Sequence, residues 1–408
     1  MATCIQCGYV LYRQSSLPIK GWIAFTLATL IVFAIANYFP IATLSVNGLV
    51  VHASLPEALA ITWQQGHELV AIMTGLFSFV MPLGQICFVL WALQVVDSGR
   101  LPADFRYGMR VLNVLEPWSM IPVLLLGILV AIVKLAGMAI LTVEPGLWGF
   151  AVLSVMLTAL SRVSAHRIWR YAEDRSLVPR SGDGIAFDKI VAACSACGFV
   201  QNISSLRQNP PCHRCGAGVH FRHRNPLSRG WALVVAASIL YIPANILPVM
   251  QISMPTGSTS HTILGGVIEL WHLGSWDLAL IVFVASVVVP MTKLLALIVL
   301  MVNRDWRGDA VQRQRTRLYE LVEFIGQWSM LDVFVVILLS AMANFPGLTQ
   351  ITAGYGAASF GMVVILTMLA AMSYDPRTGW DGRTTVDKSS GDLTSTPENG
   401  RSASSGAI

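Results

Sequence analysis

The sequence predicts an all-α, multi-pass membrane protein whose membrane part is a tandem duplication of a four-helix transmembrane module. Composition supports the membrane class, because 55% of the 408 residues are hydrophobic and only 12% are charged. A soluble domain carries about 25% charged residues. The duplication is indicated by landmarks that recur along the chain at a nearly constant spacing.

Four separated landmarks carry the repeat. They are a Cys-x-x-Cys pair, an Asn-x-x-Pro motif, a proline inside a long apolar run and the tripeptide Trp-Ser-Met. Their positions are Cys4 and Cys7 with Cys212 and Cys215, Asn37 and Pro40 with Asn245 and Pro248, Pro82 with Pro290, and residues 118–120 with 328–330. The offset is 208 residues for the first three landmarks and 210 for the last. One spacing shared by unrelated motifs favours duplication over coincidence.

Each half has room for four apolar spans of about 20 residues, the length that crosses a bilayer. We place them at 21–39, 69–95, 118–141 and 147–165 in the first half, and at 231–248, 277–301, 328–345 and 356–374 in the second. The first span is too long for a signal peptide and has a mid-chain counterpart at 231–248, so we do not expect it to be cleaved. The domains expected are 1–20, a truncated ribbon; 21–166, the first module; 167–230, a linker with a ribbon at 191–222; 231–374, the second module; and 375–408, a disordered tail.

The lysines and arginines predict the orientation. All but three of the 27 lie in 1–20, 96–117, 166–230, 302–327 and 375–408, whereas 40–68, 142–146, 249–276 and 346–355 have none. Positive charge collects on the cytoplasmic side, so both termini are expected there. The basic clusters are explained by topology and anionic headgroups rather than by nucleic acid. They comprise Arg222, Arg224 and Arg229, and Arg313, Arg315 and Arg317. On the opposite side, 46–51 and 251–254 are expected to form short strands.

The cysteines between the modules predict a metal site. Cys194 and Cys197 form one Cys-x-x-Cys knuckle, and Cys212 and Cys215 form a second after a gap of fourteen residues. Two such knuckles suit a tetrahedral Zn²⁺ ion held by four thiolates. A closed four-cysteine site leaves no position for water, so the zinc is expected to be structural. Cys4 and Cys7 match only the second knuckle, which makes a second metal site doubtful.

Ionisable and polar residues inside the spans are the candidates for transport chemistry. An ionisable group at mid-membrane costs about 2.5–3.5 kcal/mol, so it normally pairs or faces a wet cavity. Lys293 and Asp332 could neutralise each other across neighbouring helices, and Lys134 lies deep in the third span. The other candidates are Thr292, Ser329 and Asn344, with Pro290 as the residue that kinks the sixth span. The alternatives are a structural ion pair for the first two and a snorkelling side chain for Lys134.

Enzyme motifs are missing from the sequence. It contains no Gly-x-x-x-x-Gly-Lys-Ser/Thr phosphate loop, no Gly-x-Ser-x-Gly nucleophile turn and no His-Glu-x-x-His helix. We therefore expect a protein that is not an enzyme and has no ATP site of its own.

The second-half motifs and the doubled unit of ribbon plus four spans resemble the paraquat-inducible protein A family, which includes the PqiA and LetA (YebS) types. The motifs are Pro243-Ala-Asn245-Ile-Leu-Pro248, Val289-Pro290-Met-Thr292-Lys293 and Trp328-Ser329-Met330-Leu331-Asp332. The likeness covers residues 1 to about 380. It implies a bacterial inner-membrane protein that works with a periplasm-spanning MCE-domain tunnel protein of the PqiB or LetB kind. The chain departs from the pattern in its incomplete first ribbon and in Ile121-Pro122, which stand where the second half has Leu331-Asp332.

The function expected is that of a membrane subunit in an MCE-type system, handing phospholipid between the inner membrane and its tunnel partner to maintain the envelope. Two alternatives remain open from the residues. One is a small-molecule or proton-coupled secondary transporter, although two halves of four spans each share one orientation and exclude an inverted repeat. The other is a membrane regulator that senses zinc or redox state through the ribbon.

Overall fold

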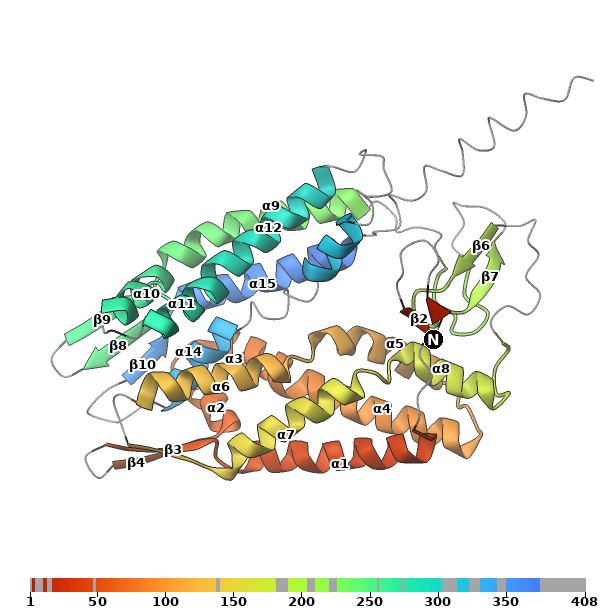
Figure 1. Ribbon diagram of the computed structural model, residues 1–408, viewed down its shortest axis with the longest axis horizontal. Coiled ribbons are helices and arrows are strands. Elements are labelled where there is room, and N and C mark those ends of the chain that lie inside the picture. The colour runs from red at the N-terminus through yellow and green to blue at the C-terminus, as the bar shows by residue number, and fades with distance from the viewer. Residues whose placement is uncertain are drawn as a thin grey trace, which may run out of the picture.

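Two helical bundles lie side by side along one long axis, with small β-sheets at one end and a cysteine-rich ribbon at the other (Figure 1). We call these ends the strand end and the ribbon end. The computed structural model describes residues 2–3, 10–12, 17–46, 49–136, 140–180, 190–203, 210–219, 226–254, 257–272, 274, 276–302, 314–322, 331–342 and 350–374.

The first bundle contains a helix, a hairpin, a long broken helix and two further helical pairs. Its elements are α1 (Ile19–Tyr38), β3 (Ala42–Val46), β4 (Leu49–Ala53), α2 (Leu55–Gln64), α3 (Glu68–Gly75), η1 (Leu76–Val80), α4 (Met81–Ser98), α5 (Phe105–Leu115), η2 (Glu116–Trp118), α6 (Ile121–Ala136), β5 (Ile140–Val143), α7 (Pro145–Leu160) and α8 (Ala165–Asp174). Strands β1 (Ala2–Thr3) and β2 (Val10–Tyr12) precede it, and the ribbon strands β6 (Ile190–Ala193) and β7 (Val200–Ile203) follow it.

The second bundle follows the element order of the first. It consists of α9 (Pro226–Ile246), β8 (Met250–Met254), β9 (Gly257–His261), α10 (Ile263–His272), α11 (Trp276–Phe283), η3 (Val284–Val288), α12 (Val289–Val302), α14 (Leu331–Met342), β10 (Gln350–Ala353) and α15 (Tyr355–Ser373). A helical segment also covers residues 314–322. From β8 to α12 every element begins 208 residues after its first-half counterpart, and α14, β10 and α15 begin 210 after theirs. These are the offsets of the sequence landmarks.

Each bundle carries a three-stranded antiparallel sheet at the strand end, with the order β4-β3-β5 in the first and β9-β8-β10 in the second. The expected strand at 46–51 is in fact the meeting point of two strands, because β3 and β4 pair as a hairpin with Ala42 opposite Ala53. The expected strand at 251–254 is part of β8. Helix α2 follows the first hairpin, and Ser54 and Glu57 start it with a capping box.

The two long helices formed by α3, η1 and α4 and by α11, η3 and α12 each contain a π-helical turn shortly before the proline that recurs at the offset of 208 residues. The turns are η1 and η3, and Pro82 and Pro290 each stand two residues beyond them. Proline has no N–H and its ring crowds the preceding carbonyl, so a regular helix cannot run through it without a local change. Ser78 and Ser286 lie in the middle of the two π turns, and their hydroxyls donate to the carbonyls of Thr74 and Val282 at 2.5 and 2.6 Å.

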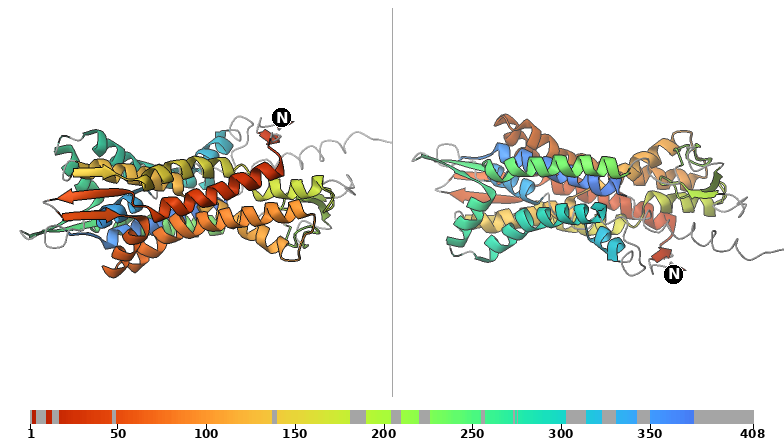
Figure 2. Two further views of the ribbon diagram at one scale, coloured as in Figure 1. Left: turned by 90° about the horizontal axis from the view of Figure 1, so that it is seen from below. Right: turned by 90° about the horizontal axis from the view of Figure 1, so that it is seen from above.

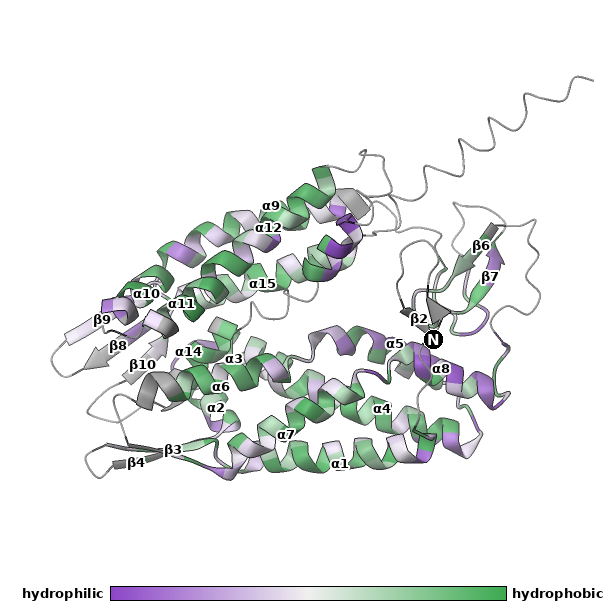
Figure 3. Ribbon diagram, in the orientation of Figure 1, coloured by the Kyte–Doolittle hydropathy of each residue, from purple (hydrophilic) through white to green (hydrophobic). Residues whose placement is uncertain are grey.

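The apolar surface of the bundles fits a membrane protein. Among the described residues, six helices are long and apolar enough to cross a bilayer, or seven if α7 and α8 count as one span bent by 53°. The sequence predicted eight spans. Helix α7 is only 16 residues long, and the expected span at 328–345 lies partly outside the described residues. Apolar residues dominate the middle of both bundles, and hydrophilic ones gather towards the ribbon end (Figure 3).

The bundles meet through α14. This helix of the second half packs against α6 and α2 of the first half. Figure 1 shows it between the two bundles, and Figure 2 shows from two further sides that the strands of both bundles lie at the same end. At Gly127 on α6, an added Cβ would lie 3.2 Å from the Cβ of Phe334 on α14, so the two helices approach closely. One core cluster thus includes buried residues of both halves, while a second cluster, mainly of α9, α12 and α15, lies within the second half.

Candidate functional site

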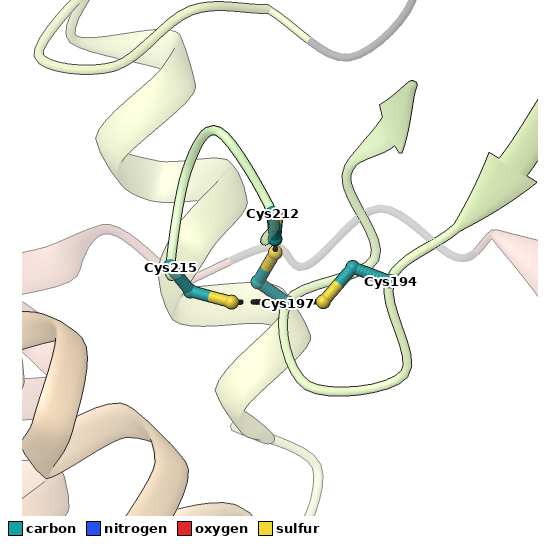
Figure 4. Close-up of side chains that lie close together, drawn as sticks. All are labelled: Cys194, Cys197, Cys212 and Cys215. Atoms are coloured by element: carbon teal, nitrogen blue, oxygen red, sulfur yellow. Dashed lines mark hydrogen bonds between the residues drawn. The ribbon is translucent and has the colours of Figure 1, made fainter. Parts of the chain in front are cut away.

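Four buried cysteine side chains converge at the ribbon end (Figure 4). The Sγ atoms of Cys194 and Cys215 are 3.6 Å apart, as are those of Cys197 and Cys212, and all four lie within 4.8 Å of one another. A tetrahedral site with Zn–S bonds of about 2.3 Å requires S–S separations of about 3.8 Å. The cluster therefore has the ligands and the spacing to hold one metal ion.

The two knuckles that present these thiols have the same backbone geometry. The N–H groups of Gly198 and Gly216 donate to the carbonyls of Cys194 and Cys212, both at 2.8 Å. Both glycines have positive φ, +72° and +68°, a conformation that glycine adopts without strain. Hydrogen bonding among the thiols, chiefly with Cys197, lowers the pKa of Cys194 to about 6. Cys4 and Cys7, the weaker metal candidates, lie outside the described residues.

The ribbon is docked on the helices of the first bundle through a buried arginine. Arg214 lies inside the second knuckle and is 4% exposed. Its guanidinium pairs with Glu173 on α8, donates to the carbonyl of Pro179 and lies over the Phe199 ring, 4.6 Å from its centroid. Arg110 on α5 donates to the carbonyl of Cys215. The position of the second knuckle is thus tied to α5 and α8.

A second contact, more exposed than that of Arg214, joins the C-terminal end of α8 to α4. Arg175 pairs with Asp97 at 2.7 Å and donates to the carbonyls of Val96 and Asp97 at the end of α4. The cysteine cluster is therefore linked to three helices of the first bundle. Sequence reasoning missed Arg214 and Glu173. An arginine placed between two cysteines of a knuckle was the available signal.

Among the described ionisable side chains of the predicted spans, that of Lys293 is the least exposed. It lies on α12, three residues after the buried Pro290, and is 2% exposed. Its Nζ has no hydrogen-bond partner among the described residues. Gln85 lies at the matching position of α4, 208 residues earlier, is 3% exposed, and its Oε1 likewise has no partner among them. Both halves thus bury a polar side chain at the same place.

The other predicted transport residues are placed only in part. Thr292 is exposed on α12 and so does not share the buried face of Lys293. Asp332 is on α14 and Lys134 is on α6, but their side chains are outside the described part of the chain. Ser329 and Asn344 also lie outside the described residues. The ion pair between Lys293 and Asp332 therefore stays a prediction.

An apolar cavity of about 70 Å³ lies where the two bundles meet near the strand end. Val130 of α6, Ile281 of α11 and Leu331 and Val335 of α14 line it, so both halves contribute. Its polar lining includes Ser286 of the π turn η3 and His261 of β9. The site combines apolar walls with a buried serine on the helix that also carries Lys293.

The family model described as "Paraquat-inducible protein A" matches residues 19–173 and 227–384, which include both helical bundles. No solved structure matches the chain.

Curated relatives cover nearly the whole chain. It is 32% identical to "Intermembrane transport protein PqiA" of Escherichia coli, over 93% of this chain and 90% of the relative. It is 31% identical to "Lipophilic envelope-spanning tunnel protein A" of the same organism, over 90% and 83%. A "Probable intermembrane transport protein" of Haemophilus influenzae is 26% identical over 93% and 90%. These relatives are named as transport proteins and not as enzymes. By family model and by identity over most of its length, this multi-pass chain belongs to the paraquat-inducible protein A family.

Proposed function

We propose that this protein is the inner-membrane subunit of an intermembrane lipid transport system, and that it hands phospholipid between the inner membrane and a periplasm-spanning MCE-domain tunnel protein. The observation that carries the proposal is the apolar cavity between the two bundles, lined by α6 and α14 and by Ser286 of η3, the turn that precedes the helix of Lys293. Apolar walls suit the methylene groups of an acyl chain. Lys293 does not line this cavity, but its buried amine suits a phosphate. The printed names of the relatives, intermembrane transport and envelope-spanning tunnel, support this class of function.

The polar part of the pathway is assigned to the second half, with Lys134 on α6 contributed by the first half. Lys293 and Asp332, with Thr292, Ser329, Pro290, Lys134 and Asn344 as further candidates, would form a headgroup site or a proton-coupled gate. Thr292 is the weakest of these, because its side chain is exposed on α12 whereas that of Lys293 is buried. No phosphate-binding loop is present in the sequence, so any driving energy comes from a gradient or another subunit.

The two bundles are proposed to be tandem copies of one four-helix module, with the elements of the second half following the first at offsets of 208 and 210 residues. The ribbon end is placed in the cytoplasm and the strand end in the periplasm. This orientation is supported by the stretches 40–68 and 249–276, which contain no lysine or arginine and form the strand end. The metal of the ribbon is proposed to be zinc, since four thiolates at tetrahedral spacing are its preferred structural site.

Lipid retention tests the assignment of the polar residues. Phospholipid that co-purifies with the detergent-solubilised chain is quantified by mass spectrometry for wild type, Lys293→Ala and Asp332→Ala, with Leu295→Ala as a control on the exposed face of α12. We expect the first two substitutions to deplete bound phospholipid at unchanged protein yield and Leu295→Ala to leave it unchanged. Equal lipid in all four proteins would reduce Lys293 and Asp332 to a structural role.

Dependence on a partner tests the transport system itself. Labelled phospholipid is followed from proteoliposomes that contain the full chain to acceptor vesicles, with and without the periplasmic tunnel protein. Transfer that requires both proteins supports the proposal. Uptake of a small molecule by the chain alone, without lipid transfer, would favour a secondary transporter instead.

A further inference from the structure

The first bundle has an open apolar groove on its outer side near the strand end. The groove has a volume of about 450 Å³ and lies between α2 and the broken helix of α3 and η1. Its walls are made only of apolar residues and glycine, including Leu59, Ala60 and Trp63 from α2, and Ile72 and Gly75 from α3. Trp63 and Ile72 are about half exposed, at 49% and 52%. The groove therefore opens to the surroundings and is not part of the packed core.

The groove lies at the depth of one bilayer leaflet. Its lining on the long helix runs from Ala71 to Val80, within the candidate span Glu68–Ser98. At a rise of 1.5 Å per residue this stretch covers about 14 Å, close to half of the ~30 Å hydrocarbon thickness. Trp63 stands at its edge, as tryptophan commonly does at a membrane interface. The groove has the length and position of a single acyl chain in the leaflet at the strand end.

Two matching positions of the second bundle carry larger side chains, which would narrow an equivalent groove there. Ile268 corresponds to Ala60, and Phe283 corresponds to Gly75 at the offset of 208 residues. An added Cβ at Gly75 would lie 3.4 Å from Leu59 Cδ1 across the groove, so even a small side chain begins to fill it. Gly75 has ordinary helical torsion angles, φ −59° and ψ −37°, so its backbone does not require glycine. The missing side chain serves the groove rather than the fold.

The charges around the groove select among headgroups. The segment 40–68, which includes α2, contains no lysine or arginine, while Glu57 and Glu68 are exposed at the start of α2 and α3. A headgroup with only a phosphate would meet carboxylates, whereas a headgroup that also carries an ammonium group would find partners for it.

We infer that this groove is a lateral binding site for one acyl chain of a zwitterionic, amine-bearing phospholipid, and that it exists only in the first half. Such a site would admit lipid from the leaflet at the strand end. The inference rests on the proposed lipid function, but the groove can be tested without any transport measurement.

Photo-labelling of the full chain in vesicles tests the site directly. The probe is a phosphatidylethanolamine with a photoreactive group on one acyl chain, and the labelled peptides are mapped by mass spectrometry. We expect labelling of 55–80 to exceed labelling of 263–288 by about tenfold, which corresponds to a preference of about 1.4 kcal/mol for the groove. Equal labelling of the two segments would overturn the inference, because it would indicate only the ordinary lipid that surrounds any span.

Exchange of the two groove residues for their second-half counterparts gives the matched variant. The double substitution Ala60→Ile and Gly75→Phe should bring labelling of 55–80 down to that of 263–288, while Leu69→Phe, which adds the same ring beside the groove without entering it, should leave labelling unchanged. Replacement of a helical glycine raises helix propensity, so loss of folding is not expected to explain the result. If folding nevertheless fails, Ala60→Ile alone, on the exposed face of α2, repeats the test.

A second probe tests the headgroup, and the transfer assay separates the two proposals. A phosphatidylglycerol with the same photoreactive chain should label 55–80 less than the amine-bearing lipid, and equal labelling by both would overturn the headgroup assignment. Labelling confined to the first half, in a chain that transfers no lipid with any partner, would support the groove and contradict the proposed function. Lipid transfer without preferential labelling would do the reverse.

Discussion

Gln85 and Lys293 occupy the same position in corresponding helices, and the two halves of the protein differ there in charge. Each residue is buried three positions after a proline that follows a π-helical turn. The amide of Gln85 fits this place without carrying a charge, whereas the amine of Lys293 has no partner among the described residues. A charge at this depth costs free energy, so we attribute its presence to function.

Exchange of the two side chains should separate fold from function. We expect Lys293→Gln to give normal amounts of folded protein, because the first half already places glutamine in this setting. Lipid transfer should fall by at least about tenfold, which corresponds to a loss of about 1.4 kcal/mol in the interaction with the transported lipid. The reciprocal change, Gln85→Lys, should lower stability by about 2.5–3.5 kcal/mol, the cost of a charge at mid-membrane. Transfer assays and thermal unfolding in detergent measure the two effects, and unchanged transfer in Lys293→Gln would contradict the functional role.

The buried pair between Arg214 and Glu173 should hold the ribbon to the first bundle. Arg214→Gln or Glu173→Gln should each destabilise this contact by about 1.5–3 kcal/mol, because each removes a hydrogen bond between charged groups that lies largely out of water. The double variant should be little worse than either single one. Hydrogen exchange of the α8 peptides measures the change.

The matched control is the exposed pair of Arg175 with Asp97, whose side chains are 37% and 28% exposed. A surface pair contributes about 0–1 kcal/mol, so Arg175→Gln should change exchange far less than Arg214→Gln. Equal effects of the two substitutions would show that Arg214 is only another surface contact.

Metal removal should release the same contact. We expect one zinc ion per chain by elemental analysis, and loss of zinc with a strong chelator should increase hydrogen exchange in both the ribbon and α8. Cys197→Ser should lower the protein level, as expected of a structural site whose loss unfolds the ribbon. Cys87→Ser is the control, since Cys87 is exposed on α4 and far along the chain from the cluster. A metal-free Cys197→Ser protein present at normal level would favour a sensing role for the ribbon.

Much of this architecture could be predicted from the sequence because it depends on patterns that repeat. The offset of 208 residues, read from Pro82 and Pro290, also fixes where β8, α10 and η3 begin. Apolar runs and the cysteine knuckles place the helices and the metal cluster in the same way. These features come from local chemistry that one segment carries by itself.

Features that depend on contacts between distant segments could not be predicted. The groove arises because Gly75 faces Leu59 across two helices, and Arg214 reaches Glu173 from 41 positions away. The hairpin of β3 and β4, in contrast, could have been predicted from the sequence, because Asn47-Gly48 is a typical turn signal between two strands. The short helices α2 and α10 were hidden in segments interpreted as loops.

At the strand end, two glycines let α7 and α15 begin close to the backbone carbonyls that follow α1 and α9. The N–H of Gly146 donates to the carbonyl of Pro40, and that of Gly356 donates to the carbonyl of Pro248, both at 3.1 Å. An added Cβ at Gly146 would lie 2.4 Å from the Pro40 oxygen, and one at Gly356 would lie 2.6 Å from the Leu247 oxygen. Real side chains do not approach backbone oxygens this closely, so the chain must shift.

We therefore expect Gly146→Ala and Gly356→Ala each to lower the free energy of unfolding by about 1–3 kcal/mol. Gly266→Ala is the control, because nothing lies within 4 Å of its added Cβ inside α10, and there alanine should stabilise the helix slightly. Thermal unfolding of the three variants in one detergent gives the comparison, and a Gly146→Ala protein as stable as Gly266→Ala would contradict the close approach of α7 to Pro40.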